Sequence, residues 1–368
     1  MPTKPARYAQ LSARETATLP FILLGIPFVL AGTLFALPFS NKPKEKHWRR
    51  VLTERILRYV SSISMSQTQK LTGTTESVYR KAVVKLRVKP VVEDLGHGAE
   101  LFWLGPKRND RILLYVHGGA FYAPPMEPAL YCLDHVRKKL EARTNSLDVG
   151  VAILKYSLWP EAAFPTPLHQ AVLAIQHLLA SGVHPSGLQL IGDSAGANLI
   201  TQVLLHTLIP LDGVPPLKLT APLGGVFLIS PWASLSAKSP SHTRNNGSDW
   251  IAAESIRYWG AAILADVPTP LRGYIEAVDA PDAWFDGLER VVRRVFITAG
   301  GAECLLDDIV QFADIVKKHH SRVDFLIEEG GVHDDMIVDF VSGLPEEQLS
   351  ETSSICVQWL AEGFDEAK

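Results

Sequence analysis

After residue 110, short runs of consecutive apolar residues alternate with longer segments of helical periodicity. A strand that is apolar on both faces must be covered on both faces, as strands inside a parallel sheet are. The alternation therefore predicts an α/β fold with a mostly parallel central sheet flanked by helices. The expected strands are residues 83–92, 99–104, 111–116, 149–154, 188–191, 226–229, 295–298 and 323–327. The expected helices are residues 44–70, 128–141, 167–180, 195–208, 251–264, 303–319 and 346–362.

The composition excludes several classes of protein. The 368 residues include 36 Lys and Arg against 39 Asp and Glu, so the near-neutral balance predicts no nucleic-acid partner. Cys132, Cys304 and Cys356 are too few and too widely spaced for a disulfide framework or a zinc site. The sequence has no P-loop and no HExxH motif, and we expect neither a metal nor a cofactor. The composition predicts no particular oligomeric state.

The N-terminal segment is set apart by its lack of charge. Residues 16–41 contain no charged side chain, and residues 19–39 are long and apolar enough to span a bilayer as a helix. A secretory signal has a shorter apolar region and a small-residue cleavage site, and a core helix has a polar face. We expect a retained single-pass anchor, in the endoplasmic reticulum or another endomembrane. A cleaved signal and a buried or interfacial helix are the alternatives.

Changes of pattern along the chain divide it into four parts. Residues 1–18 form a tail ahead of the anchor. Residues 41–85 are expected to form amphipathic helices, whose position just after the anchor suits a lid or a membrane-surface helix. Residues 86–368 form the α/β domain. Within it, the irregular segment at about 234–270 is expected to be an insertion over the C-terminal end of the sheet.

A candidate nucleophile lies between an apolar strand and a helix. The segment Gly192-Asp193-Ser194-Ala-Gly196 has the Gly-x-Ser-x-Gly pattern, and a strand before it and a helix after it are what a nucleophile elbow requires. The serine occupies a strained turn, and the glycines let the strand and helix approach closely. Ser194 is therefore the predicted nucleophile, with Asp193 as part of the supporting motif.

A second glycine motif follows the strand at residues 111–116. His117 is followed by Gly118 and Gly119, and adjacent glycines let main-chain N–H groups face a ligand. We expect the N–H groups of Gly118, Gly119 and Ala195 to form an oxyanion hole. The His117 side chain is expected to brace this loop.

A serine nucleophile needs a histidine base and an acid that orients it. His333 follows the last expected strand, where the final member of the order serine, acid, histidine belongs. Glu303 is the first acidic residue after the strand at residues 295–298. Asp307 and Asp308 follow in the same segment, and Asp307 is the alternative to Glu303 as the acid.

These motifs resemble those of the hormone-sensitive-lipase branch of α/β hydrolases over about residues 85–365. The glutamate at position 303 stands where the family's acid motif usually has aspartate. An N-terminal anchor ahead of such a domain is similar in layout to fungal steryl acetyl hydrolases and related biosynthetic esterases. The motifs are HGGAF at 117–121, YSLWPEAAFP at 156–165, GDSAGANL at 192–199, SPW at 230–232 and ECLLDD at 303–308.

The resemblance implies hydrolysis of carboxylic esters through an acyl-serine intermediate, without metal or cofactor. The expected substrate is a short-chain ester, acetyl above all, of a hydrophobic alcohol such as a sterol, terpenoid or polyketide. The resemblance also implies that the helices within residues 41–85 and the insertion at about 234–270 form a cap over the site. In this cap, Trp250, Tyr258 and Trp259 either line the alcohol pocket or only pack the cap. The alternatives are an amide, formamide or lactone hydrolase, an acyltransferase, a catalytically silent receptor and a membrane scaffold.

Overall fold

The structure is a computed structural model that describes residues 7–37, 46–143 and 148–367. One eight-stranded sheet has the order β1-β2-β4-β3-β5-β6-β7-β8. All neighbours from β4 to β8 are parallel, whereas β1 pairs antiparallel with β2 and β2 antiparallel with β4. The mostly parallel α/β sheet predicted from the sequence is therefore confirmed. The strands are β1 (Val91–Gly96), β2 (Ala99–Trp103), β3 (Ile112–Val116), β4 (Gly150–Lys155), β5 (Leu188–Asp193), β6 (Gly225–Ile229), β7 (Val295–Gly300) and β8 (Val323–Glu328).

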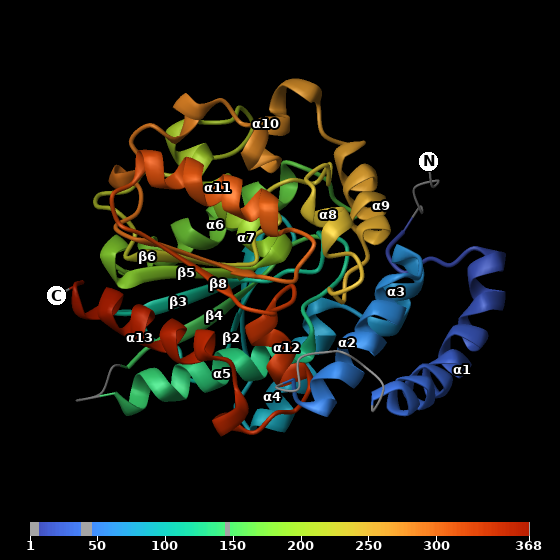
Figure 1. Cartoon of the computed structure of the whole chain (residues 1–368). Coiled ribbons are helices and arrows are strands. Elements are labelled where there is room, and N and C mark those ends of the chain that lie inside the picture. The colour runs from blue at the N-terminus through green and yellow to red at the C-terminus, as the bar shows by residue number, and fades with distance from the viewer. Residues whose placement is uncertain (1–6, 38–45, 144–147, 368) are drawn as a thin grey trace.

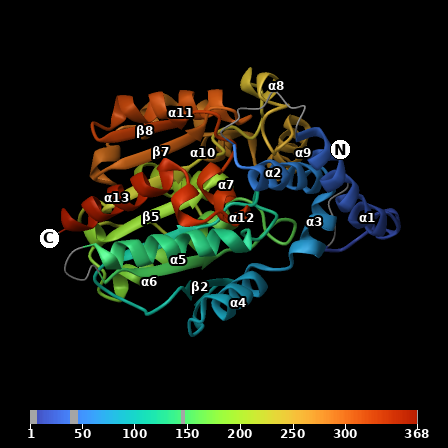
Figure 2. The same ribbon diagram turned by 60° about the horizontal axis from the view of Figure 1, so that its bottom comes forward.

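Helices cover both faces of this sheet (Figures 1 and 2). Helices α12 and α13 pack against α5 on one face, and α6 packs against α7 on the other. The helices are α1 (Ala13–Ala36), α2 (Trp48–Ser61), α3 (Met65–Thr72), α4 (Thr75–Leu86), α5 (Glu127–Ala142), α6 (Thr166–Ala180), α7 (Ser194–Leu208), α8 (Ser241–Arg244), α9 (Ala253–Leu264), α10 (Arg272–Ile275), α11 (Leu306–His319), α12 (Asp335–Val341) and α13 (Glu351–Asp365).

The central strands are apolar throughout because each face of the sheet has its own core. In β3, Ile112, Leu114 and Val116 pack into the core that contains α6 and α7. The intervening Leu113 and Tyr115 pack into the core that contains α5 and α13. Side chains alternate between the faces of a strand, so a strand covered on both sides must be apolar at every position.

Two expectations about the region before β1 are wrong. Residues 83–92 are not one strand, because Val83 belongs to the buried face of α4 and β1 begins only at Val91. Residues 44–70 are not one helix, since α2 ends at Ser61 and α3 begins at Met65. Ser64 caps α3 by accepting a hydrogen bond from the Gln67 N–H at 3.2 Å. A local cap thus outweighs the continuous amphipathic pattern.

Helix α1 lies on the outside of the molecule beside α2 (Figures 1 and 2). None of its residues is buried, and it is long and apolar enough to cross a membrane. The Tyr59 hydroxyl of α2 donates a hydrogen bond to the Ile22 carbonyl at 3.1 Å. The expected anchor at residues 19–39 therefore coincides largely with α1. Residues 1–6 of the expected tail, 38–39 of the expected anchor and 41–45 of the expected cap lie outside the described residues.

Candidate active site

The turn between β5 and α7 holds Ser194 in a strained backbone conformation. Ser194 has a φ of 49°, in the left-handed region that side chains other than glycine rarely adopt. A Cβ on Gly196 would lie 2.0 Å from the Val116 carbonyl oxygen, and one on Gly192 would lie 2.8 Å from the Gly196 carbonyl carbon. Only glycine fits at both positions, so the sharp strand-to-helix turn predicted around Ser194 is present.

His333 contacts Glu303, the acid expected first. The Nδ1 atom of His333 lies 2.9 Å from Glu303 Oε2, and both side chains are fully enclosed by the protein. The other carboxylate oxygen of Glu303 accepts a hydrogen bond from the Gly300 N–H at 3.0 Å. The turn after β7 therefore fixes the carboxylate, and the carboxylate orients the imidazole ring.

The alternative acids have other partners. Asp307 accepts hydrogen bonds from the Ser241 N–H at 2.8 Å and from the Arg244 guanidinium at 2.6 Å. Asp308 pairs with His242 at 2.8 Å. Both aspartates thus join α8 to the first turn of α11, and the structure brings Glu303 rather than Asp307 to His333.

A second carboxyl group lies on the other side of the His333 ring. Asp334 Oδ2 is 3.3 Å from His333 Nε2. Burial alone lowers the pKa of His333, but the nearby Asp334, Glu303 and Asp249 outweigh it and raise this pKa to about 10. Burial raises the pKa of Asp334 well above its usual value. The two residues therefore retain a proton where an isolated histidine would have lost it.

The backbone of His333 is held by Asp249, which the sequence did not single out, and by Trp250, one of the three aromatic residues that it did. Asp249 Oδ1 accepts a hydrogen bond from the His333 N–H at 3.1 Å, and Oδ2 accepts one from the Cys304 N–H at 2.8 Å. The Trp250 indole N–H donates to the His333 carbonyl oxygen at 2.7 Å. Asp249 thus links the loop after β7, which carries Glu303, to the loop after β8, which carries His333 (the histidine loop). No local motif marks it, because its partners lie more than 50 residues away in sequence.

The glycine loop after β3 corrects one expectation. The Gly118 N–H donates to Asp193 Oδ1 at 3.0 Å, so it is not available for an oxyanion. The Tyr115 hydroxyl donates to the same Asp193 oxygen at 2.6 Å. Gly119 has a φ of 104°, and a Cβ there would lie 2.3 Å from the Ala123 carbonyl oxygen. The loop therefore requires glycine at position 119, and Asp193 fixes its first amide.

His117 braces this loop from behind. Its Nδ1–H donates to the Gly118 carbonyl oxygen at 2.6 Å, and its Nε2 lies 3.3 Å from the Thr75 hydroxyl. Its ring stacks on Tyr156 with centroids 4.4 Å apart. Burial lowers the pKa of His117 to about 4, which keeps the ring neutral. His117 thus supports the loop and has no contact with the His333 pair among the described hydrogen bonds.

Ser194, His333 and Asp334 line one cavity of about 170 Å³, together with Gly118 and Gly119. The opposite wall comes from α2, α3, α9 and the insertion, and most of it is apolar. Of the three insertion aromatics, Trp250 and Trp259 line the cavity. Tyr258 is half-buried against the core and is not among the described lining residues. The members of this wall include Leu57, Val60, Thr68, Thr72, Trp250, Ile251 and Trp259.

Comparison with known proteins places this site in a family. A profile of the alpha/beta hydrolase fold matches residues 113–337. An acetyl-hydrolase of Streptomyces hygroscopicus is 36% identical over 142 residues, which are 38% of this chain and 42% of that protein. An esterase of Acinetobacter venetianus is 27% identical over 221 residues, which are 60% of this chain and 66% of that protein. The chain thus spans less than two thirds of the length of these relatives.

The solved structures agree on the fold. The crystal structure of an esterase from the bacterial hormone-sensitive lipase family has a TM-score of 0.64 and 24% identity. The match covers 87% of this chain and 99% of that one. The family profile covers more than half of the chain and includes all of β3 except Ile112, the Ser194 turn, Glu303 and His333. The chain belongs to the alpha/beta-hydrolase family that its motifs predict.

Proposed function

We propose that this protein is a serine esterase that hydrolyses carboxylic esters through an acyl-serine intermediate. The contact between Glu303 and His333, beside a cavity that Ser194 lines, is the observation that carries the proposal. A buried carboxylate that orients a histidine next to a serine in a strained turn is the arrangement that nucleophilic acyl transfer requires. The similar proteins described as an acetyl-hydrolase and an esterase support the same chemistry.

In this mechanism His333 moves one proton in each half of the reaction. Its Nε2 takes the proton of the Ser194 hydroxyl as the serine oxygen attacks the ester carbonyl, and Glu303 stabilises the resulting imidazolium through Nδ1. The proton passes to the leaving alcohol when the carbon–oxygen bond breaks. His333 then removes a proton from the water that attacks the acyl-serine. It returns this proton to the Ser194 oxygen as the acyl–oxygen bond breaks and the acid is released.

The oxyanion that forms in each step needs donors other than Gly118, whose N–H is held by Asp193. The proposed donors are the N–H groups of Gly119 and Ala195, with Ala120 as the next amide of the same loop. Ala120 lines the cavity and has a φ of 50°, which continues the left-handed turn of Gly119. Ala195 lies in the first turn of α7, where N–H groups lack intrahelical partners.

The proposed substrate is a short-chain ester, acetyl above all, of a hydrophobic alcohol such as a sterol, terpenoid or polyketide. The acyl group and part of the alcohol must share the cavity beside Ser194, which favours a short acyl group. Trp250, Trp259 and Val60 present apolar surface to the same cavity and support an apolar alcohol. The acetyl-hydrolase relative supports acetyl as the acyl group.

We further propose that α1 anchors the protein as a single-pass helix in the endoplasmic reticulum or another endomembrane. Phe21, Phe28 and Phe35 are each more than 70% exposed, an arrangement that suits lipid better than water. Helix α2, which packs beside α1, supplies Leu57 and Val60 to the cavity wall. An apolar ester dissolved in the membrane would thus meet the cavity close to the bilayer.

A series of chromogenic esters tests the reaction class and the acyl preference together. We expect the acetyl ester to be hydrolysed fastest and the dodecanoyl ester slowest, because the cavity restricts the acyl chain. Ser194→Ala should lower kcat on the order of 10⁶-fold and leave the thermal unfolding temperature nearly unchanged. Hydrolysis by Ser194→Ala at the wild-type rate would contradict the assignment of the nucleophile.

A pair of isosteric amide variants tests the acid. Glu303→Gln should lower kcat by about 10³- to 10⁴-fold, because the neutral amide cannot stabilise the imidazolium. Asp307→Asn is the matched control, since Asp307 contacts Ser241 and Arg244 instead of His333. Steady-state kinetics on the preferred ester compare the two, and a larger loss in Asp307→Asn would reverse the assignment.

Deletion of residues 1–41 tests the anchor. The full chain should remain with membranes after alkaline carbonate extraction, whereas the shortened chain should be soluble and should still hydrolyse the preferred ester. Deletion of residues 1–11, which leaves α1 and its N-cap Ser12 in place, is the control and should stay with the membranes. Recovery of the full chain in the soluble fraction would contradict the anchor.

A further inference from the structure

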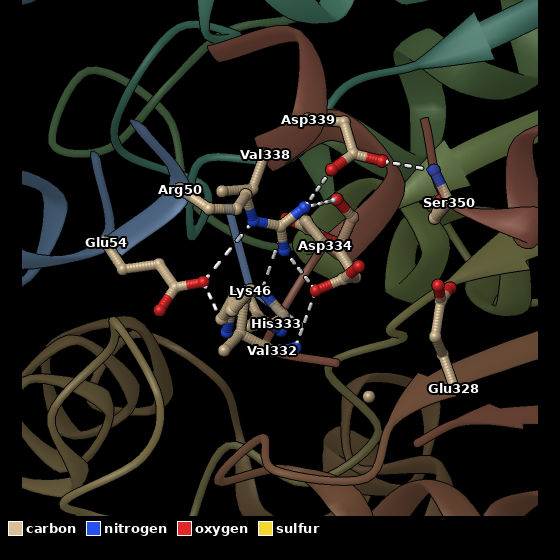
Figure 3. A network of polar contacts seen from close by, with 12 residues as sticks. Lys46, Arg50, Glu54, Glu328, Val332, His333, Asp334, Val338, Asp339 and Ser350 are labelled. Carbon is tan, nitrogen blue, oxygen red and sulfur yellow. Dashed lines mark hydrogen bonds and ion pairs between the residues drawn. The ribbon is translucent and has the colours of Figure 1, made fainter. Parts of the chain in front are cut away.

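A buried arginine on α2 reaches the segment that carries the candidate catalytic histidine. Arg50 lies in the first turn of α2, and its side chain is only 5% exposed. Figure 3 shows its guanidinium between Glu54 and Asp339, with His333 and Asp334 drawn in the same group of residues. These contacts join Arg50 to Asp335 and Asp339, which lie almost 300 positions later in the sequence.

The guanidinium holds Asp335 in two places. Its Nη1 donates to the Asp335 carbonyl oxygen at 3.1 Å, and its Nη2 donates to Oδ1 of the Asp335 carboxylate. The same Oδ1 accepts a hydrogen bond from the Val332 N–H at 2.8 Å. Val332 and Asp335 flank the His333–Asp334 pair, so this carboxylate closes a short loop around the histidine and Arg50 fixes the carboxylate.

The charge balance makes this loop dependent on Arg50. The carboxylates of Glu54, Asp335 and Asp339 all pair with the guanidinium. Lys46 adds a second cation, but its ion pair is with Glu54 and not with Asp335 or Asp339. Without Arg50, the carboxylates of Asp335 and Asp339 would lie close together with no cation between them among the described residues, and they would repel each other. Asp335 would then move and release the Val332 N–H.

Helix α2 also reaches the other support of His333. The Arg58 guanidinium donates to the Asp249 carbonyl oxygen at 2.8 Å, and the Ser61 hydroxyl donates to the Trp250 carbonyl oxygen at 3.3 Å. Asp249 and Trp250 bind the backbone N–H and carbonyl of His333. One cap helix therefore contacts both segments that fix the backbone of the histidine.

We propose that Arg50 is a positioning residue that holds His333 in its working orientation. The inference rests on the proposed function, in which His333 is the base. Arg50 acts through Asp335 and the histidine loop and has no described contact with the cavity. Because Arg50 lies on α2 and α2 packs against α12, catalysis is thereby coupled to the docking of α2 on the hydrolase domain.

Matched arginine variants separate positioning from stability. Arg50→Gln should lower kcat for the preferred ester by about 100-fold with little change in KM, because a small displacement of the base slows both half-reactions. Arg137→Gln is the control, since Arg137 is 7% exposed and pairs with Asp134 and Glu141 inside α5. This control should lose thermal stability to a similar extent and keep kcat within a few-fold of wild type.

Variants of the carboxylates locate the effect in the histidine loop. Asp335→Asn should lower kcat about as much as Arg50→Gln, and the double variant should lose little more, because both changes release the same loop. Asp339→Asn should lower kcat less, since Asp339 links Arg50 to the Ser350 N–H and not to Val332. Arg50→Lys keeps the charge without the two-pronged geometry and should give an intermediate kcat.

The rate at which a fluorophosphonate labels Ser194 provides a readout that needs no ester substrate. If the wild-type protein hydrolyses no ester, the proposed function fails, but slower labelling of Arg50→Gln than of Arg137→Gln would still support the positioning role. If Arg50→Gln keeps the kcat and the labelling rate of the wild-type protein, the positioning role of Arg50 is overturned. Equal losses of kcat in Arg50→Gln and Arg137→Gln would overturn it too, because the effect would then follow stability alone.

Discussion

Parallel strands end on a common edge, and every part of the candidate site depends on this constraint. The loops after β3, β5, β7 and β8 leave the sheet at the same edge and carry the glycine loop, Ser194, Glu303 and His333. Groups from distant parts of the sequence thus meet without any long excursion of the chain. The strand-to-helix turn adds the second requirement, because Gly196 must pack directly on the end of β3 to expose Ser194.

The electrostatics of the site are dominated by carboxyl groups around a single imidazole. Glu303 and Asp334 face the two ring nitrogens of His333, while Asp249 binds its backbone. Removing one partner of such a buried pair typically costs about 3–5 kcal/mol, so these contacts also hold the loops together. Asp334 is the unusual member, because it lies beside the nitrogen that must accept the serine proton. His333 can take the serine proton only while its Nε2 carries no proton.

The sequence predicted those parts of the site that depend on local pattern. An apolar strand, Gly-x-Ser-x-Gly and a helix are contiguous, so the turn at Ser194 is readable from about a dozen residues. Glu303 and Asp307 could not be separated in this way. Their roles depend on whether the side chain meets His333 or α8, which the packing of α11 decides. The role of Gly118 could not be predicted from local pattern either, because its N–H donates to Asp193 at the end of β5.

The errors in the fold have a related cause. Apolar residues from Val83 onward are as compatible with the buried face of a helix as with a strand, and the contacts of α4 with α5 decide in favour of the helix. Asp249 and Arg50 lie in segments that carry no catalytic motif. Each binds the histidine segment across a long separation in sequence, and such pairings are visible only in the folded chain.

The most direct test of the account is to find where an acyl group resides during turnover. The reaction with an activated acetyl ester would be stopped by acid within the first turnovers, and the protein would be digested and mapped by mass spectrometry. The account predicts an acetyl group on the peptide that contains Ser194, and none on this peptide in Ser194→Ala. Continued hydrolysis with no acyl group on Ser194, or with the group on another residue, would contradict it.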